Sequence, residues 1–215
     1  IVQIQDILQR KLAQSVSDTI LMLFDKLSHT YAYGDGLQNR LHYSGWKTNE
    51  AYKVNTKKVI IPHMRAYGDY SFNKDKFDLG YSNRDTLSDI HKTLRFLDTG
   101  LSESFDLDSF LKDRQEPKNI DCQYFVLDFF KKGTCHIKWK RPDLIEKLNI
   151  YGSQKKGWLP PTYGNKAYRD MTPEEKSVVD SFQGEADYNK VCLEKSKYFV
   201  LNPLALAGEI SENIA

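Results

Sequence analysis

The sequence has few cysteines and no long apolar run. Its three cysteines, Cys122, Cys135 and Cys192, are an odd number and show no CxxC spacing, so neither a disulfide framework nor a zinc site is predicted. No apolar segment approaches the roughly 18 residues of a membrane span, and no basic-then-apolar signal opens the chain. We therefore expect a cytoplasmic protein with no membrane partner.

An excess of charge of one sign is also missing. Lys and Arg number 31 and Asp and Glu number 29, which gives a formal net charge of +2 over 215 residues. This balance argues against a protein that coats nucleic acid or membrane by bulk charge, so a site for a polyanion must be local. The hydrophobic content of 40% and aromatic content of 13% are sufficient for a buried core.

Apolar residues recur at steps of three and four between Val2 and His29, which predicts one long amphipathic helix, or two in line. At 1.5 Å per residue this helix would be roughly 40 Å long, enough to cross a domain or to join it to a neighbour. We interpret it as a core helix, with a linker or dimer helix as the alternative. The chain begins at Ile1 within this pattern, and we expect a piece of a longer protein.

The next part of the chain reads as strands and loops. Tyr31–Gly45 is polar and glycine-bearing and predicts a loop. Ala51–Val54 and Lys58–Pro62 are β-branched and apolar, and with Asn55-Thr56 between them they predict a hairpin. Arg65–Asn83 predicts an irregular connection.

Two helices and a central strand follow. Arg84–Asp98 predicts a helix with Asn83 and Asp85 as candidate N-caps, and Leu107–Lys112 predicts a shorter one capped by Asp106. Ile120–Phe130 is apolar on both alternating sets, which is typical of a strand buried on both faces.

Thr134–Lys140 alternates apolar and polar residues, so it predicts a second strand, joined by the turn Lys131–Gly133 and cationic on one face. Pro142–Asn149 predicts a short helix, and Ile150–Asp170 a long ordered loop. Thr172 to Glu175 has the pattern of a capping box that starts a helix.

A last helix is predicted from Glu185 to about Phe199 and ends before Asn202-Pro203. The sequence thus predicts an α+β fold with a long N-terminal helix, a small antiparallel sheet with hairpins, and C-terminal helices. We expect a single domain over residues 1–215, with the long helix in 1–30 and the main body in 45–200.

No catalytic or metal-binding residue is predicted. Leu159-Pro160-Pro161-Thr162 lacks the acceptor and the ring of the Asp/Asn-Pro-Pro-aromatic motif of DNA amino-methyltransferases. Cys135 and His136 would point to opposite faces of a strand, and Glu174-x-Lys176 lies in a helix without an upstream strand carboxylate. There is no Gly-rich loop after a strand, so no cofactor is expected in this segment.

Basic and aromatic residues alternate between positions 131 and 158. Cations on one surface neutralise phosphates, Gln and Arg can read base edges, and a Trp can stack on a base. The candidate nucleic-acid-binding residues are Lys131, Lys132, Lys138, Lys140, Arg141, Gln154, Lys155, Lys156 and Trp158. The alternative is a solvated hairpin edge with a Trp packed under the loop.

Several blocks of this sequence resemble a bacterial domain of unknown function found behind adenosylmethionine-dependent DNA methyltransferase domains in phage and mobile-element proteins. The Gly157-Trp158-Leu159-Pro160-Pro161-x-Tyr163-Gly164 block is the most specific. The resemblance also covers residues 45–49, 54–62, 133–137, 148–156, 168–171 and 174–182.

The resemblance implies a non-catalytic accessory or target-recognition domain of a DNA adenine methyltransferase. It implies DNA and an N-terminal methyltransferase domain as partners, with adenosylmethionine bound in that upstream domain. The alternatives are a protein-interaction module that dimerises through the first helix, and a metal-dependent nuclease.

Overall fold

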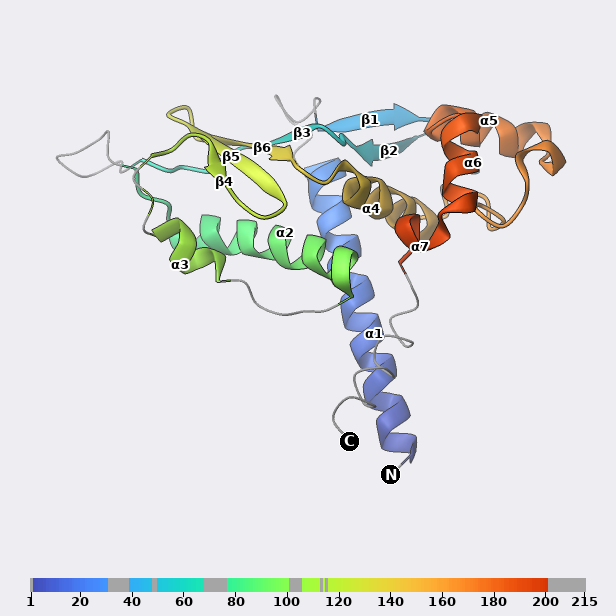
Figure 1. Ribbon diagram of the computed structural model, residues 1–215, viewed down its shortest axis with the longest axis horizontal. Helices are drawn as coiled ribbons and strands as arrows, with labels where there is room; N and C mark the ends of the chain where they lie inside the picture. Colours follow the sequence, from blue (N-terminus) through green and yellow to red (C-terminus); the bar gives the residue numbers. More distant parts are fainter. Residues whose placement is uncertain are drawn as a thin grey trace. The chain divides into compact units, whose positions relative to one another are not determined.

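The computed structural model describes residues 2–30, 39–47, 50–67, 77–100, 106–112, 114 and 116–200 (Figure 1). Within these residues the fold is mixed α and β, as predicted, with a long N-terminal helix, two small antiparallel sheets and C-terminal helices. The helices are α1 (Val2–Asp25), α2 (Tyr81–Thr99), α3 (Leu107–Lys112), α4 (Pro142–Lys155), α5 (Pro173–Phe182), α6 (Glu185–Leu193) and α7 (Lys195–Tyr198). The strands are β1 (Arg40–Tyr43), β2 (Ala51–Val54), β3 (Lys58–Ile61), β4 (Ile120–Asp121), β5 (Phe125–Phe130) and β6 (Thr134–Trp139).

The chain divides into two compact units. Unit 1 comprises Ile1–Asp25, His42–Lys53 and Glu146–Ala215, and unit 2 comprises Lys26–Leu41 and Val54–Ile145. Each unit buries its own apolar side chains, such as Phe24 and Val179 in unit 1 and Phe125 and Ile137 in unit 2.

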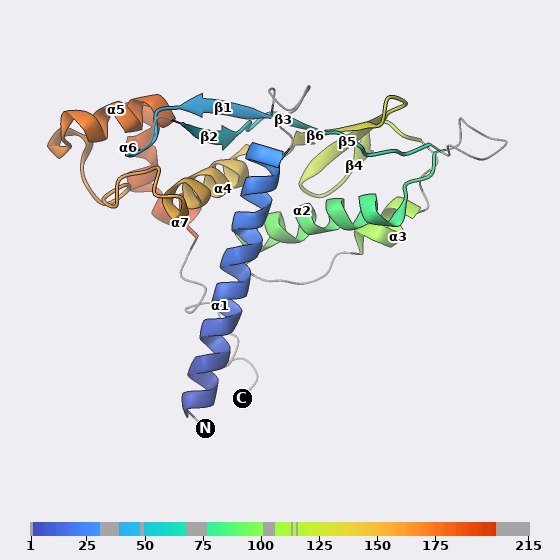
Figure 2. The same ribbon diagram turned by 180° about the vertical axis from the view of Figure 1, so that it is seen from behind.

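Unit 2 is built on an antiparallel sheet of order β3-β6-β5-β4. β5 and β6 form the predicted hairpin, in which Phe125, Leu127 and Phe129 share one face with the apolar side chains of β6. α2 covers this face (Figure 2): the His91 ring lies 5.2 Å from the Tyr124 ring and 6.2 Å from the Phe125 ring. Most of the apolar core of unit 2 therefore lies on this side of the sheet, although Ile60, opposite His136, is buried on the other.

The predicted hairpin between Ala51–Val54 and Lys58–Pro62 is wrong. Both strands exist, but β2 pairs with β1, and β3 pairs with β6. Asn55 makes the break: its side chain accepts a hydrogen bond from the Lys57 N–H at 2.9 Å, and its own N–H donates to the Asn39 carbonyl at 2.6 Å. Because these bonds hold Asn55 in an Asx turn, the chain changes direction there, and β2 and β3 enter different sheets.

β1 lies in the segment predicted to be a loop, and this part of the prediction is wrong. The Asn39 side chain beside it donates to the Ile60 carbonyl and accepts from the Ile60 N–H, so a side-chain amide takes the place of a neighbouring strand at the edge of β3. Residues 31–38, the rest of the predicted loop, and 68–76, in the predicted irregular connection, lie outside the described residues.

The single strand predicted over Ile120–Phe130 is two strands, β4 and β5. A tight turn separates them, closed by a hydrogen bond of 2.9 Å from the Cys122 N–H to the Phe125 carbonyl. Burial on both faces is confirmed only in part: on the second face Asp128 is buried, whereas Val126 and Phe130 are half-buried.

The predicted helices of unit 2 are confirmed, with one cap reassigned. α2 begins after Gly80 and has no side-chain cap, so Asn83 and Asp85 lie inside the helix. Asp106 does cap α3: its carboxylate accepts a hydrogen bond of 3.0 Å from the Ser109 N–H.

In unit 1, α4 continues to Lys155, so the loop predicted from Ile150 begins only after that residue. Gly152 lies inside the helix, where a Cβ atom would overlap the Phe24 ring of α1. Here the glycine allows two helices to approach closely instead of ending one, which the sequence pattern does not distinguish.

The capping box of α5 is confirmed. The Thr172 side chain accepts a hydrogen bond from the Glu175 N–H, and the Glu175 carboxylate accepts from the Thr172 N–H at 2.8 Å. The same carboxylate accepts from Lys166 Nζ at 2.7 Å and from the Thr162 hydroxyl at 3.0 Å, although only 7% of the residue is exposed. It therefore holds the loop before α5 to the start of the helix.

The last predicted helix is two, because the backbone leaves helical geometry at Glu194, between α6 and α7. Asn202 and Pro203, predicted to end it, lie outside the described residues.

Gly152→Ala is expected to destabilise the chain by about 1–3 kcal/mol, as overpacking does, because the added methyl group meets the Phe24 ring. An Ala in an unobstructed helix would instead stabilise by roughly 0.5–1 kcal/mol. Urea denaturation measures the difference. The control is Gly80→Ala, where nothing lies within 4 Å of the added atom. In a Phe24→Leu background the cost of Gly152→Ala should shrink, and equal costs in both backgrounds would contradict the assigned contact.

Glu175→Gln is expected to lower the free energy of unfolding at pH 7 but not in acid. The hydrogen bond from Lys166, followed by that from the Thr172 N–H, lowers the pKa of the Glu175 carboxyl below its ordinary value of 4.5. A carboxyl with a lowered folded-state pKa stabilises the fold above its unfolded-state pKa, and this contribution is lost as the pH falls through the folded-state value. The difference between parent and variant in denaturation curves should therefore shrink as the pH falls below the ordinary glutamate pKa of 4.5 and vanish below the lowered folded-state pKa. Glu174→Gln, in the same turn, is the control and should lose less, because Glu174 is exposed.

Candidate nucleic-acid interface

Several lysines gather on the second face of the unit 2 sheet. The strand register places Lys58 of β3 directly opposite Lys138 of β6, which in turn lies opposite Val126 of β5 and, one strand further, Asp121 of β4. Residues directly opposite one another share a face, so this row points away from the core. We call this surface the basic sheet face; its cations are Lys58, Lys118, Lys132, Lys138 and Lys140.

Two carboxylates lie among these cations. Lys138 Nζ is 2.8 Å from Asp128 Oδ2, and Lys140 Nζ is 2.8 Å from Asp121 Oδ1. Burial raises the pKa of the Asp128 carboxyl, but the hydrogen bonds from Lys138 and from the Asn119 N–H outweigh it, and the net pKa is lowered. The five named cations outnumber these two carboxylates.

Two rings stand among the lysines. Phe130 and His136 are half-buried, with ring centroids 4.3 Å apart, and Lys118 Nζ lies 2.9 Å from the Phe130 centroid. Burial lowers the pKa of His136, and the charges of Lys58, Lys132 and Lys118 lower it further. The imidazole is therefore neutral at pH 7 and offers a flat ring beside the cations.

Five of the nine candidate residues lie in unit 2. Lys132, Lys138 and Lys140 belong to the basic sheet face, and Lys131 is exposed in the turn beside it. Arg141 is held differently: its guanidinium contacts Asp98 of α2 at 3.0 Å and Asp143 of α4 at 2.7 Å. These bonds raise the pKa of Arg141, chiefly through Asp143, and they tie the end of β6 to helices.

The other four lie in unit 1. Gln154 and Lys155 are in the last turn of α4, and Lys156 follows it with Nζ 2.9 Å from Asp25 Oδ2. Trp158 is buried, with its ring centroid 6.0 Å from that of Phe24, and its backbone N–H donates to the Ser153 carbonyl at 2.9 Å. The Trp therefore packs under the loop in this conformation. DNA binding by these nine residues stays a prediction.

The sequence pattern missed Lys58, Lys118 and the pairing of Phe130 with His136. Lys58 reaches the face only because β3 pairs with β6, a pairing between strands more than 70 residues apart along the chain. Lys118 precedes β4 and is brought in by the β4–β5 turn. The sequence shows the alternation of apolar and polar residues within each strand, but it does not show the register between strands. This register brings the lysines together on one face.

The described part of the chain contains no group of three or more His, Cys, Asp or Glu side chains placed to hold a metal ion, and no helix long and apolar enough to cross a membrane. Cys122 and Cys135 are buried, and burial raises the pKa of both thiols, that of Cys122 to about 12. Neither thiol is therefore activated as a nucleophile.

Comparison with protein families gives one match. Residues 3–158 match the family described as Domain of unknown function (DUF4942), and the chain belongs to this family. No curated protein and no solved structure matches the chain. The matched range includes all the strands of the basic sheet face.

Proposed function

We propose that the chain is a non-catalytic DNA-contacting accessory or target-recognition domain associated with an adenosylmethionine-dependent DNA adenine methyltransferase, and that the basic sheet face makes the contact. The observation that carries the DNA part is the placement of Lys58 directly opposite Lys138. Like charges directly opposite one another destabilise a sheet. Asp128 already offsets the charge of Lys138, and a polyanion on this face would offset that of Lys58 as well.

The arrangement suits phosphates and bases together. Several lysines on one face neutralise neighbouring phosphates and release counterions, which is the main sequence-independent term in DNA binding. The half-buried Phe130 and His136 rings beside them can stack on an unpaired base, as aromatic side chains do in proteins that bind single strands. Because the whole chain has a net charge of only +2, binding should be confined to this face.

The methyltransferase part rests on the resemblance around Trp158 to Gly164. In this proposal the partner domain supplies the adenosylmethionine and the catalytic groups, and this chain holds the duplex.

A second candidate, a protein-interaction module that dimerises through α1, is favoured by exposed apolar side chains on that helix. Ile7 is 53% exposed and Met22 is 71% exposed. A dimer would bury such side chains. Sedimentation equilibrium over a range of concentrations separates this candidate from a monomer that binds DNA.

Lys58→Ala combined with Lys132→Ala is expected to weaken binding of a labelled 20-base-pair duplex at every salt concentration. The slope of log K against log salt should flatten by about two units at most, one for each lost phosphate contact. Fluorescence anisotropy between 25 and 200 mM salt measures both quantities. Lys92→Ala combined with Lys112→Ala is the charge-matched control, because both are exposed on the helices of unit 2. Equal loss in both double variants would refute a localised face, and binding by neither parent nor control would refute DNA binding itself.

Asp121→Asn is expected to act in the opposite direction and tighten binding, which a folding defect does not do. The exposed fractions of the Asp121 and Lys140 side chains are 68% and 41%, so their ion pair contributes little to stability. Removing the carboxylate leaves Lys140 for phosphate, and the salt slope should steepen by up to about one unit. Asp187→Asn is the matched control: its exposed pair with Lys190 has the same 2.8 Å separation but lies in unit 1. Tightening by both variants alike would mean that only total charge matters.

A further inference from the structure

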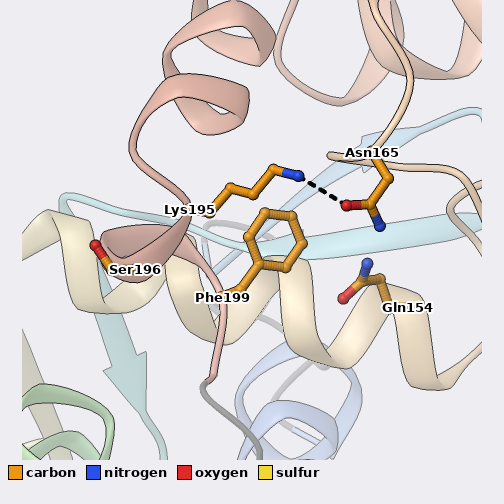
Figure 3. A pocket seen from close by; sticks show the side chains of 5 residues that line it. All are labelled: Gln154, Asn165, Lys195, Ser196 and Phe199. Carbon is orange, nitrogen blue, oxygen red and sulfur yellow. Dashed lines mark hydrogen bonds between the residues drawn. The ribbon is translucent and has the colours of Figure 1, made fainter.

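A pocket of about 290 Å³ opens in unit 1 (Figure 3). It lies between the end of α4, the loop before α5, and α7. Its lining residues are Gln154, Asn165, Lys195, Ser196 and Phe199. Only one of the nine candidate residues, Gln154, is among them.

The ring of Phe199 forms one wall, and its place is fixed by the backbone beneath it. Gly164 has a φ of 80°, and a Cβ atom there would overlap the Phe199 ring, so the ring packs directly on a glycine backbone. The Gly164 N–H donates to the Tyr188 hydroxyl at 3.0 Å, and that hydroxyl donates to the Lys166 carbonyl at 2.7 Å. The wall is therefore held by the turn and by α6.

A hydrogen bond orients one amide of the pocket. Lys195 Nζ donates to Asn165 Oδ1 at 2.8 Å. Because Lys has no acceptor, this bond fixes the amide, and Asn165 Nδ2 must point the other way. Figure 3 shows this nitrogen on the side towards Gln154, whose amide lies across from it beside the Phe199 ring.

The ammonium group of Lys195 has a neutral hydrogen-bond partner, the Asn165 amide, and none of the five lining residues is acidic. The pocket thus combines one ammonium group, two amides and the face of a ring, while the Ser196 hydroxyl points away from them (Figure 3). An anion would be attracted, and a flat ring would find a stacking partner.

We propose that this pocket binds a small molecule that carries an anionic group on a planar ring system. The ring lies against Phe199, and the anionic group accepts hydrogen bonds from Lys195 and Asn165. A nucleoside monophosphate and an aromatic carboxylate both have this chemistry. The volume is at the lower end of that of ligand pockets, which suits one such molecule. The inference does not depend on DNA binding by unit 2.

The test is a titration of the ¹⁵N-labelled 215-residue chain with AMP and with indole-3-carboxylate, monitored through the side-chain amide signals of Gln154 and Asn165. The two arms distinguish a nucleotide from an aromatic acid. Inorganic phosphate, acetate and adenosine are titrated separately. We expect one of the two complete molecules to shift both amide signals and to bind at least ten times more tightly than any of the three fragments. No shift up to 10 mM of either molecule, or equal binding of the fragments, would overturn the proposal.

Variants locate the contacts. Lys195→Ala should weaken binding about tenfold or more, as loss of a hydrogen bond to a charged group does. Phe199→Leu keeps an apolar wall without a flat ring and should reduce the preference for the complete molecule over its anionic fragment. Lys190→Ala is the control, because it removes the same charge from α6 outside the pocket lining. If Lys190→Ala weakens binding as much as Lys195→Ala, the molecule is attracted by general charge and the proposed site is wrong.

Discussion

The antiparallel pairing of β5 with β6 determines the organisation of unit 2. It places Phe125, Leu127 and Phe129 beside the apolar side chains of β6 on one face, and these side chains have almost no exposed surface. Because successive side chains point to opposite sides, the same register sends Lys138 and His136 to the other face. The same strand pairing therefore both buries the core under α2 and assembles the basic sheet face. A shift of the register by one residue would bury cations and expose the core.

The elements that could be predicted are those whose information is local. The helices Leu107–Lys112 and Pro173–Phe182 carry their own caps, and the β5–β6 hairpin carries its alternation and its turn. The predictions were wrong where a contact with a residue far away along the chain determines the local structure. Gly152 reads as a helix end, but Phe24, 128 positions earlier, makes it a point of close approach. Asn55 reads as a hairpin turn, yet its bond to Asn39 directs the next strand into another sheet.

The candidate site shows the same division. The lysines of the turn and of β6 were visible as a cationic stripe, whereas Lys58 and Lys118 required the strand order. Composition also could not show which cations are already neutralised. Arg141 is one of the predicted nucleic-acid-binding residues, and a guanidinium matches a phosphate in geometry. Its two carboxylate partners come from α2 and α4, and they make it a link between elements of unit 2.

The distribution of carboxylates, more than the number of lysines, sets what the basic sheet face can bind. Asp128 is nearly buried and accepts from Lys138 and from the backbone of Asn119, so its removal would leave unpaired groups in the sheet. Asp121 is exposed, and its pair with Lys140 is a surface pair of little structural value. Asp128 therefore stabilises the fold, while Asp121 mainly lowers the positive potential at the β4 edge. A face that only needed solvation would gain little from this asymmetry. In the proposed contact with DNA, the Asp121 carboxylate would moderate the affinity, because it lowers the positive potential beside Lys140.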